Sequence, residues 1–154
     1  MKLFSIFRGD KRRNTLKIGA GKYVIDIPEK YLWEYDEEDT LLFYPEGNET
    51  ITIRTSVLSF ERKDGTPGDG AHVVLEEAVL KNYKHEKLSD GSVLSEKQPY
   101  YTTEGDTELI MKFWYLGRDN SLIIFSSTTV VEQKDSKEVT EMLSDLPQVI
   151  TSAK

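Results

Sequence analysis

Two strand-like segments around a short polar turn, at residues 107–129, constrain the fold more than any other feature of the sequence. The segments read TELIMKFWYL and SLIIFSSTT, and GRDN lies between them. Runs rich in β-branched and aromatic residues around such a turn are typical of a β-hairpin. Alternation places Leu109, Met111, Phe113 and Tyr115 on one face, and Ile110, Trp114 and Leu116 on the other. Because both faces are apolar, we expect cover over most of both and place this hairpin near the middle of a sheet.

Other segments of the chain also have the composition of strands. They are residues 23–27, 31–35, 40–44, 50–60, 93–97 and 100–103, and residues 50–60 alternate most clearly. Turn residues such as Pro, Gly and Asn separate most of these segments. Short links of this kind favour antiparallel pairing.

Helical spacing replaces strand alternation in two places. From Ala71 the apolar residues recur about every 3.6 positions, with Asp69 as the predicted N-cap and the turn at 89–91 as the end. The expected buried stripe of this helix is Ala71, Val74, Leu75, Ala78, Val79, Tyr83 and Leu88.

A second predicted helix follows residue 129. Asp135 and Glu138 have the spacing of a capping box, and Pro147 is expected to shorten or kink the helix. Its expected buried stripe is Val139, Met142, Leu143, Leu146 and Ile150.

The order of these elements predicts an α+β fold. Two amphipathic helices cover one or both faces of a mainly antiparallel sheet, as an α/β/α sandwich. We assign residues 1–20 to an N-terminal arm, with room for a short edge strand, and residues 21–154 to a single domain.

Composition narrows the function classes. The chain has 154 residues, a formal net charge of −7 and no cysteine, which removes disulfides, thiol catalysis and cysteine-based zinc sites. Nucleic-acid binders usually carry a basic face, and here only the arm is basic, at residues 11–13. No run approaches the roughly 20 apolar residues of a membrane span, and the apolar patch near Met1 is too short for a secretory signal. We therefore expect a cytoplasmic protein that binds no nucleic acid.

Catalytic and metal-binding patterns are sparse. His72 and His85 would lie roughly 20 Å apart on one continuous helix, too far to share a metal ion. One alternative interpretation is a small hydrolase or ligand-binding enzyme that uses His72 with Glu76 or Glu77; the ordinary interpretation of His72 is a solvated or capping histidine. A second alternative is a divalent-metal-binding accessory protein that uses the acidic residues 36–39; the ordinary interpretation of these residues is a solvated turn. In the leading interpretation we assign no catalytic residue, metal ligand or cofactor.

Aromatic residues are the clearest candidates for a binding surface. They crowd into the predicted strands, and an antiparallel sheet cannot bury all of them. We select Trp33, Tyr35 and Trp114 first, and Tyr101 after them, as a candidate surface for a partner.

The element order also resembles a known group of proteins. The segments IDIPE (25–29), WEY (33–35), LLFYPE (41–46) and ITIRTSV (51–57), followed by a helix, a hairpin set and a C-terminal helix, resemble the PsbP-like group over residues 22–150. That group includes photosystem II extrinsic proteins, Mog-type Ran-binding proteins, the lipoprotein DcrB and type VI secretion effector chaperones. The resemblance implies an α/β/α sandwich that binds proteins and carries no shared catalytic motif. The lipoprotein members have a lipobox cysteine that this chain lacks, so we expect no membrane anchor of that kind.

These observations together predict a non-enzymatic bacterial protein-binding module. An adaptor, a secretion-effector chaperone and a toxin-neutralising immunity-type protein all fit the pattern. The expected partner is another protein, and a basic one would complement the acidic chain. The sequence is also compatible with a homodimer.

Overall fold

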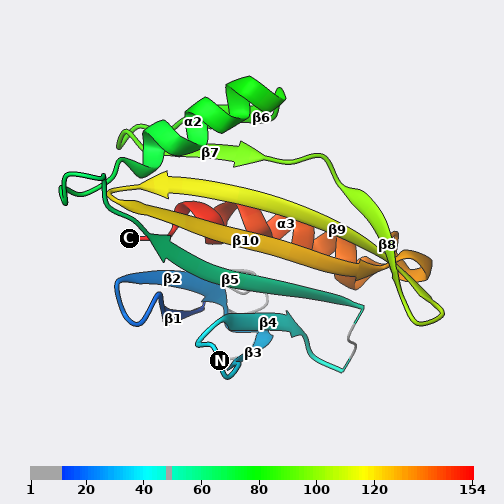
Figure 1. Cartoon of the computed structure of the whole chain (residues 1–154). Helices are drawn as coiled ribbons and strands as arrows, with labels where there is room; N and C mark the ends of the chain where they lie inside the picture. Colours follow the sequence, from blue (N-terminus) through cyan, green and yellow to red (C-terminus); the bar gives the residue numbers. More distant parts are fainter. Residues whose placement is uncertain (1–11, 48–49) are drawn as a thin grey trace.

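The computed structural model describes residues 12–47 and 50–154, and within them two antiparallel sheets and two α-helices (Figure 1). The strands of the main sheet are β3 (Tyr31–Tyr35), β4 (Leu41–Pro45), β5 (Ile51–Ser59), β6 (Lys84–Lys87), β7 (Val93–Glu96), β8 (Tyr100–Glu104), β9 (Thr107–Arg118) and β10 (Ser121–Val130). Their order is β3-β4-β5-β10-β9-β7-β6, and β8 pairs with β9 beyond the end of β7. The helices are α2 (Gly70–Lys81) and α3 (Lys137–Thr151), and a 3-10 turn, η1 (Val131–Gln133), precedes α3. The predicted α+β class with an antiparallel sheet and two helices is confirmed.

The predicted hairpin is the centre of the main sheet. β10 pairs with β9 on one side and with β5 on the other. The chain reverses at Asp119, whose φ of 49° lies in the left-handed region. Side chains of β9 and β10 that point to one face, such as Leu116, Ile123 and Phe125, are fully buried.

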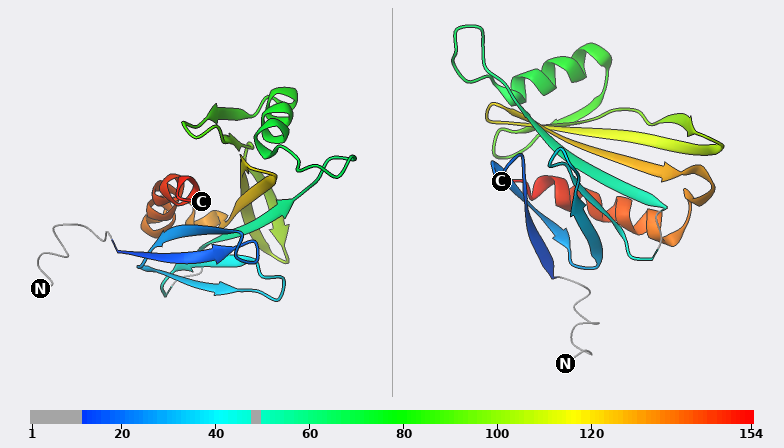
Figure 2. Two further views of the ribbon diagram at one scale, coloured as in Figure 1. Left: turned by 90° about the vertical axis from the view of Figure 1, so that its left-hand side faces the viewer. Right: turned by 60° about the horizontal axis from the view of Figure 1, so that its bottom comes forward.

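The core lies on the face of the main sheet that α3 covers, which we call the back face (Figure 2). There α3 packs an apolar stripe that includes Val139, Met142 and Leu146. The helix begins after Ser136, whose hydroxyl accepts a hydrogen bond from the N–H of Val139, so the prediction of Asp135 as the cap is wrong by one residue. The helix continues through Pro147 to Thr151, so this proline does not shorten it.

A second, two-stranded sheet adds to this core. It pairs β1 (Arg13–Ile18) with β2 (Tyr23–Pro28), and Leu16 and Ile18 are buried. Residues 13–18 of the predicted N-terminal arm are therefore a strand packed against the domain, and residues 1–11 of that arm lie outside the described residues.

Helix α2 begins as predicted and ends earlier. The side chain of Asp69 accepts a hydrogen bond from the N–H of His72, which confirms it as the N-cap. Asn82 has a φ of 57°, and the N–H of Tyr83 donates to the carbonyl of Ala78 at 2.8 Å, which closes the helix. Asn is one of the few residues that adopt this left-handed conformation easily. The predicted extension to residue 88 is wrong, and His85 lies on β6 instead of the helix.

The opposite face of the main sheet, which we call the front face, is covered by α2 only at one end. Two glycines set this position: a Cβ on Gly117 would lie 2.1 Å from the carbonyl oxygen of Gly70. The first turn of α2 therefore rests directly on the end of β9, and the helix packs over β7 and β9 (Figure 1). We expected cover over most of both faces of the hairpin; the back face has it, and much of the front face does not.

Candidate functional site

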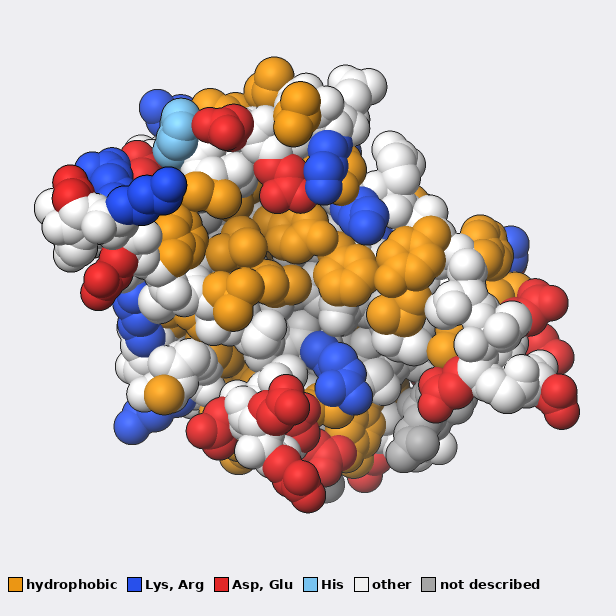
Figure 3. All heavy atoms as spheres, viewed as in Figure 1, with side chains coloured by type: hydrophobic (Ala, Val, Ile, Leu, Met, Phe, Trp, Pro, Cys, Tyr) orange, Lys and Arg blue, Asp and Glu red, His pale blue; other side chains and the backbone are white. Residues whose placement is uncertain are grey.

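The front face carries a band of apolar side chains that the described elements leave partly uncovered (Figure 3). We call this band the front patch, and it consists of Leu58, Val73, Tyr100, Phe113, Tyr115, Leu122 and Ile124. Leu58 is 56% exposed, and the patch residues of β9 and β10 are partly exposed even though these are the central strands of the sheet. Apolar side chains of central strands are normally buried, so this band is the candidate functional site.

Strand register places the patch residues next to one another. Leu58 of β5 is paired with Leu122 of β10, and Ile124 of β10 is paired with Tyr115 of β9. Directly paired residues of antiparallel strands share a face and lie in contact distance. The patch is therefore continuous across β5, β10 and β9.

Three stacked rings extend the patch toward β8. Tyr100 stacks on Phe113, and Phe113 stacks on Tyr115, with centroids 6.3 Å apart in each pair and ring planes 8° and 11° apart. The ammonium group of Lys97 lies 5.3 Å from the ring centroid of Tyr100 and 5.8 Å from that of Phe113. This end of the patch is thus a flat aromatic surface with a cation already beside it.

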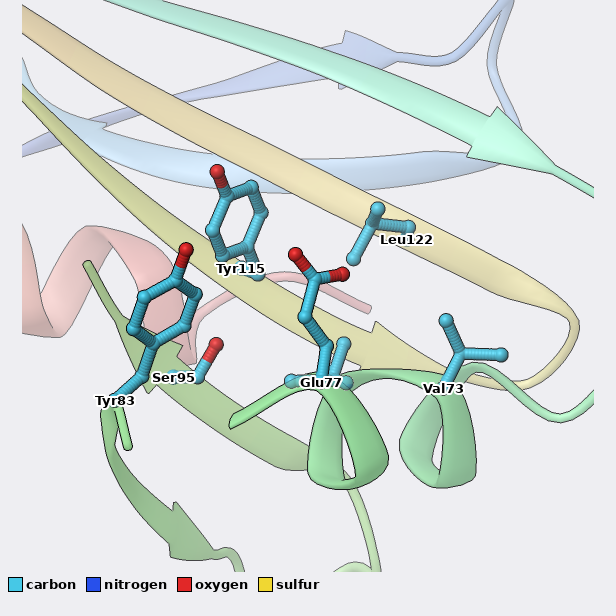
Figure 4. A pocket seen from close by; sticks show the side chains of 7 residues that line it. Val73, Glu77, Tyr83, Ser95, Tyr115 and Leu122 are labelled. Carbon is cyan, nitrogen blue, oxygen red and sulfur yellow. The ribbon is translucent and has the colours of Figure 1, made fainter. Parts of the chain in front are cut away.

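A pocket of about 70 Å³ lies at the other end, between α2 and the sheet (Figure 4). It is lined by Val73, Val74, Glu77, Tyr83, Ser95, Tyr115 and Leu122. The carboxylate of Glu77 extends from α2 toward the space beside Tyr115. Burial raises the pKa of Tyr115, and the charges of Tyr83 and Glu77 raise it further. The pocket therefore combines apolar walls and two phenol rings with one carboxylate.

Two of the aromatic residues selected from the sequence are exposed, but on the edge of the back face. Trp33 and Tyr35 lie on the edge strand β3, with ring centroids 5.9 Å apart in an edge-to-face arrangement. They pair with Phe43 and Leu41, which are buried in the core. The hydroxyl of Tyr35 donates to the carbonyl of Lys17 in β1 at 2.6 Å, so this side chain also holds the two sheets together.

The selection of Trp114 for a partner surface is wrong. Its side chain is only 9% exposed, because it lies on the back face, paired with Phe125 in the core. Tyr101 is exposed on β8, but β8 and β3 lie on opposite sides of the sheet. The structure therefore does not bring the four selected aromatic residues together.

His72 and Glu76 of the enzyme alternative lie in solvent, whereas Glu77 lines the pocket beneath α2. The imidazole Nε2 of His72 lies 3.0 Å from a carboxylate oxygen of Glu76, and both side chains are mostly exposed. The carboxylate of Asp36 accepts hydrogen bonds from the N–H groups of Glu38 and Thr40 at 2.8 and 3.0 Å, so it organises its own turn. Among the described residues, no three His, Asp or Glu side chains are grouped so that they could hold a metal ion.

Sequence reasoning missed the aliphatic part of the front patch. Leu58 and Leu122 look like ordinary strand residues, because alternation does not tell which face a helix will cover. One signal was available: Leu80 is apolar on a side of α2 that the predicted stripe does not use, and it is exposed. Val79, which the prediction placed in the buried stripe, is exposed as well, so that part of the prediction is wrong. Such a helix does not cover a face as fully as a strongly amphipathic one.

Comparisons with known proteins show the fold and no family. No family model matches the chain, and no curated protein sequence does. A crystal structure from Bacteroides thetaiotaomicron VPI-5482 is similar over 91% of this chain, with a TM-score of 0.63 and 16% identity. The alignment spans 47% of that protein's own chain, so the likeness concerns the fold of about half of it.

A cyanobacterial PsbP, CyanoP from Synechocystis sp. PCC 6803, aligns over 95% of this chain and 94% of its own. The identity is 10% and the TM-score is 0.42, which is too low to support an argument about this chain.

In the described part of the chain, no helix is long and apolar enough to cross a membrane.

Proposed function

We propose that this chain is a protein-binding module and that the front patch is its docking surface. The observation that carries the proposal is the exposure of apolar side chains on the central strands β9 and β10, where α2 leaves the sheet open. Large exposed apolar patches mark interaction sites in soluble proteins. The stacked rings of Tyr100, Phe113 and Tyr115 add the side chains that interfaces favour.

The shape of the surface favours a protein partner over a small ligand. The pocket beneath α2 holds about 70 Å³, whereas sites for drug-sized ligands hold roughly 300–1,000 Å³. Most of the patch is a broad band, which suits an apolar face of another macromolecule. The net charge of −7 favours a basic partner, because complementary charge speeds association and excludes acidic competitors.

An adaptor, an effector chaperone and an immunity-type protein would each use such a surface. The resemblance to the PsbP-like group supports this set of roles, and a bacterial, cytoplasmic setting is part of the proposal. Trp33 and Tyr35 on β3 stay candidates for a second contact region, since they are exposed on another side of the molecule.

The test is site-specific photo-crosslinking in cells that make the chain. A photoreactive residue at position 58 lies in the front patch, and one at Val79, which is 64% exposed and about half a turn around α2 from Glu77, is the matched control. We expect one partner to be linked from position 58 and not from position 79, and to be identified by mass spectrometry.

The identified partner is then purified for binding measurements. Leu58→Glu and Ile124→Glu are expected to weaken its binding by at least about tenfold, which is the effect of roughly 1.4 kcal/mol. Equal crosslinking from both positions, or unchanged affinity in both variants, would contradict the proposal.

A further inference from the structure

We propose that the pocket beneath α2 receives the cationic end of one lysine or arginine side chain of the partner. This inference rests on the proposed function and names the residue that anchors the partner. Of the side chains that line the pocket, Glu77 is the one carboxylate, and it points into the space between α2 and β9 (Figure 4). The walls are apolar where the stem of such a side chain would lie, at Val73, Val74 and Leu122.

The size of the pocket selects a single side-chain end. About 70 Å³ is too small for a cofactor or a peptide backbone, but it suits an ammonium or guanidinium group with the last carbons of its stem. Val73, Tyr115 and Leu122 line the pocket and also belong to the front patch. A basic residue in the pocket would therefore be surrounded by the apolar contacts of the docked partner, which exclude water and strengthen its pairing with Glu77.

The phenol rings favour a cation at this point. Tyr83 and Tyr115 both line the pocket, and the faces of aromatic rings attract ammonium and guanidinium groups. The phenol of Tyr115 is neutral at pH 7, because the ordinary pKa of tyrosine is about 10 and burial, then the charges of Tyr83 and Glu77, raise the pKa of Tyr115 further. The ring can thus contact the cation without ionising.

Glu77 already binds an ammonium group in the free protein. The Nζ of Lys81 lies 3.0 Å from a carboxylate oxygen of Glu77, one turn further along α2. Both side chains are about half exposed, so solvent screens this pair and an incoming cation can displace Lys81. Lys81 is therefore an internal competitor for the pocket.

The charges around the patch fix which end takes the basic residue. At the β8 end, Lys97 occupies the space over Tyr100 and Phe113, so a second cation there would be repelled. Glu76, beside Glu77 on α2, is paired with His72 and is mostly exposed. The site for a cation is therefore at the α2 end, and the partner's orientation follows from it.

The test uses small probes, so it does not depend on finding the partner. N-acetyl-lysine methylamide, N-acetyl-arginine methylamide and the neutral N-acetyl-norleucine methylamide are titrated into the labelled protein, and amide chemical shifts are followed. We expect saturable shifts at Glu77, Ser95 and Tyr115 with the lysine or arginine probe, with a Kd on the order of millimolar. The norleucine probe shares the stem and lacks the charge, so it should give none. The comparison of the two cationic probes decides between ammonium and guanidinium.

Variants make the test specific to the pocket. Glu77→Gln should weaken binding of the cationic probe by about two- to fivefold, the range for a half-exposed ion pair, whereas Glu76→Gln removes the same charge one residue away and should leave binding nearly unchanged. Lys81→Gln should tighten binding, because it removes the internal competitor. The inference is overturned if no probe gives saturable shifts, if norleucine binds as well as lysine, or if Glu77→Gln has no effect. None of these results would contradict the proposed function, because the crosslinking at position 58 tests that function independently.

Discussion

The rings of Phe113 and Tyr115 lie two residues apart on β9 and stack with their planes 11° apart on the front face. Trp114 lies between them in the sequence and points to the back face, into the core. One strand thus supplies the core with one face and the candidate binding surface with the other. Most of the expected behaviour of this protein follows from that division.

The two tryptophans should differ strongly in their effect on stability. Trp114→Ala leaves a cavity in the core and should lower the free energy of unfolding by about 3–5 kcal/mol. Trp33→Ala removes a side chain that is 42% exposed and should cost about 1 kcal/mol or less. Urea denaturation of both variants measures the difference.

Fluorescence gives an independent check of the same placement, because the chain has only these two tryptophans. Trp33→Phe leaves the buried indole and should show emission at shorter wavelength than Trp114→Phe, which leaves the exposed one. The opposite order would place Trp114 in water and would contradict the division of β9 into a core face and a surface face.

Neighbouring isoleucines on β10 provide a matched pair for the front patch. Ile123 is fully buried on the back face, and Ile124 is partly exposed in the patch. Ile123→Thr buries a hydroxyl in the core and should lower the free energy of unfolding by about 2 kcal/mol or more. Ile124→Thr should cost less than about 1 kcal/mol and should reduce binding of a hydrophobic dye to the folded protein. Equal losses of stability would mean that the patch is part of the core.

The strands were predictable from the sequence, but the face of the main sheet that the helices leave uncovered was not. The β9–β10 hairpin was predictable because its composition and its Gly-Arg-Asp-Asn turn agree at the local level. Apolar residues on both faces of β9 show that both faces make contacts, but not whether a helix or a partner makes them. The pattern therefore does not show which of Trp114 and Tyr115 is buried, and only the positions of α2 and α3 separate them.

The ends of the two helices were also not fully predictable from the sequence. α2 stops because Asn82 takes a left-handed conformation, and the residues after it, which include His85, continue in β6. An apolar spacing that happens to persist to residue 88 hides this end. At α3 both Asp135 and Ser136 are good capping residues, and the structure uses Ser136.

The contact between Gly117 and Gly70 should be the most sensitive point of the front face. Gly117→Ala would place a Cβ 2.1 Å from a backbone oxygen of α2, and backbone cannot move aside as a flexible side chain can. The first turn of α2 must shift, and we expect a loss of about 1–3 kcal/mol in the free energy of unfolding. The pocket should change shape as well, so the amide shifts of Ser95 and Tyr115 should move. A variant with unchanged stability and unchanged spectrum would show that α2 does not rest on this strand.

Alkaline pH should weaken the contact between β3 and α3. The hydroxyl of Tyr31 donates to the carboxylate of Asp145, and Lys30 pairs with Asp145 at 2.9 Å. Burial raises the pKa of Tyr31, and the hydrogen bond to Asp145 raises it further. The folded protein therefore favours the neutral phenol. This stabilisation is complete below the unfolded pKa of about 10 and is lost as the pH rises above it toward the folded value.

The pKa of Lys30 is raised too, because its hydrogen bonds to Glu141 and Asp145 outweigh the burial that acts to lower it. Its contribution is likewise lost only above about pH 10.4. Both groups thus predict stability that falls in the same alkaline range.

Tyr31→Phe tests this contact. At pH 7 it should lower the free energy of unfolding by about 1–3 kcal/mol, because it removes a partly buried hydrogen bond to a charged group. Above pH 10 its stability should fall less steeply than that of the unmodified protein, because it no longer has the phenol that must ionise. Urea denaturation at pH 7, 9, 10 and 11 measures both effects, and Tyr101→Phe, which removes an exposed hydroxyl on β8, is the control. An equally steep alkaline fall in Tyr31→Phe would mean that some other group governs it.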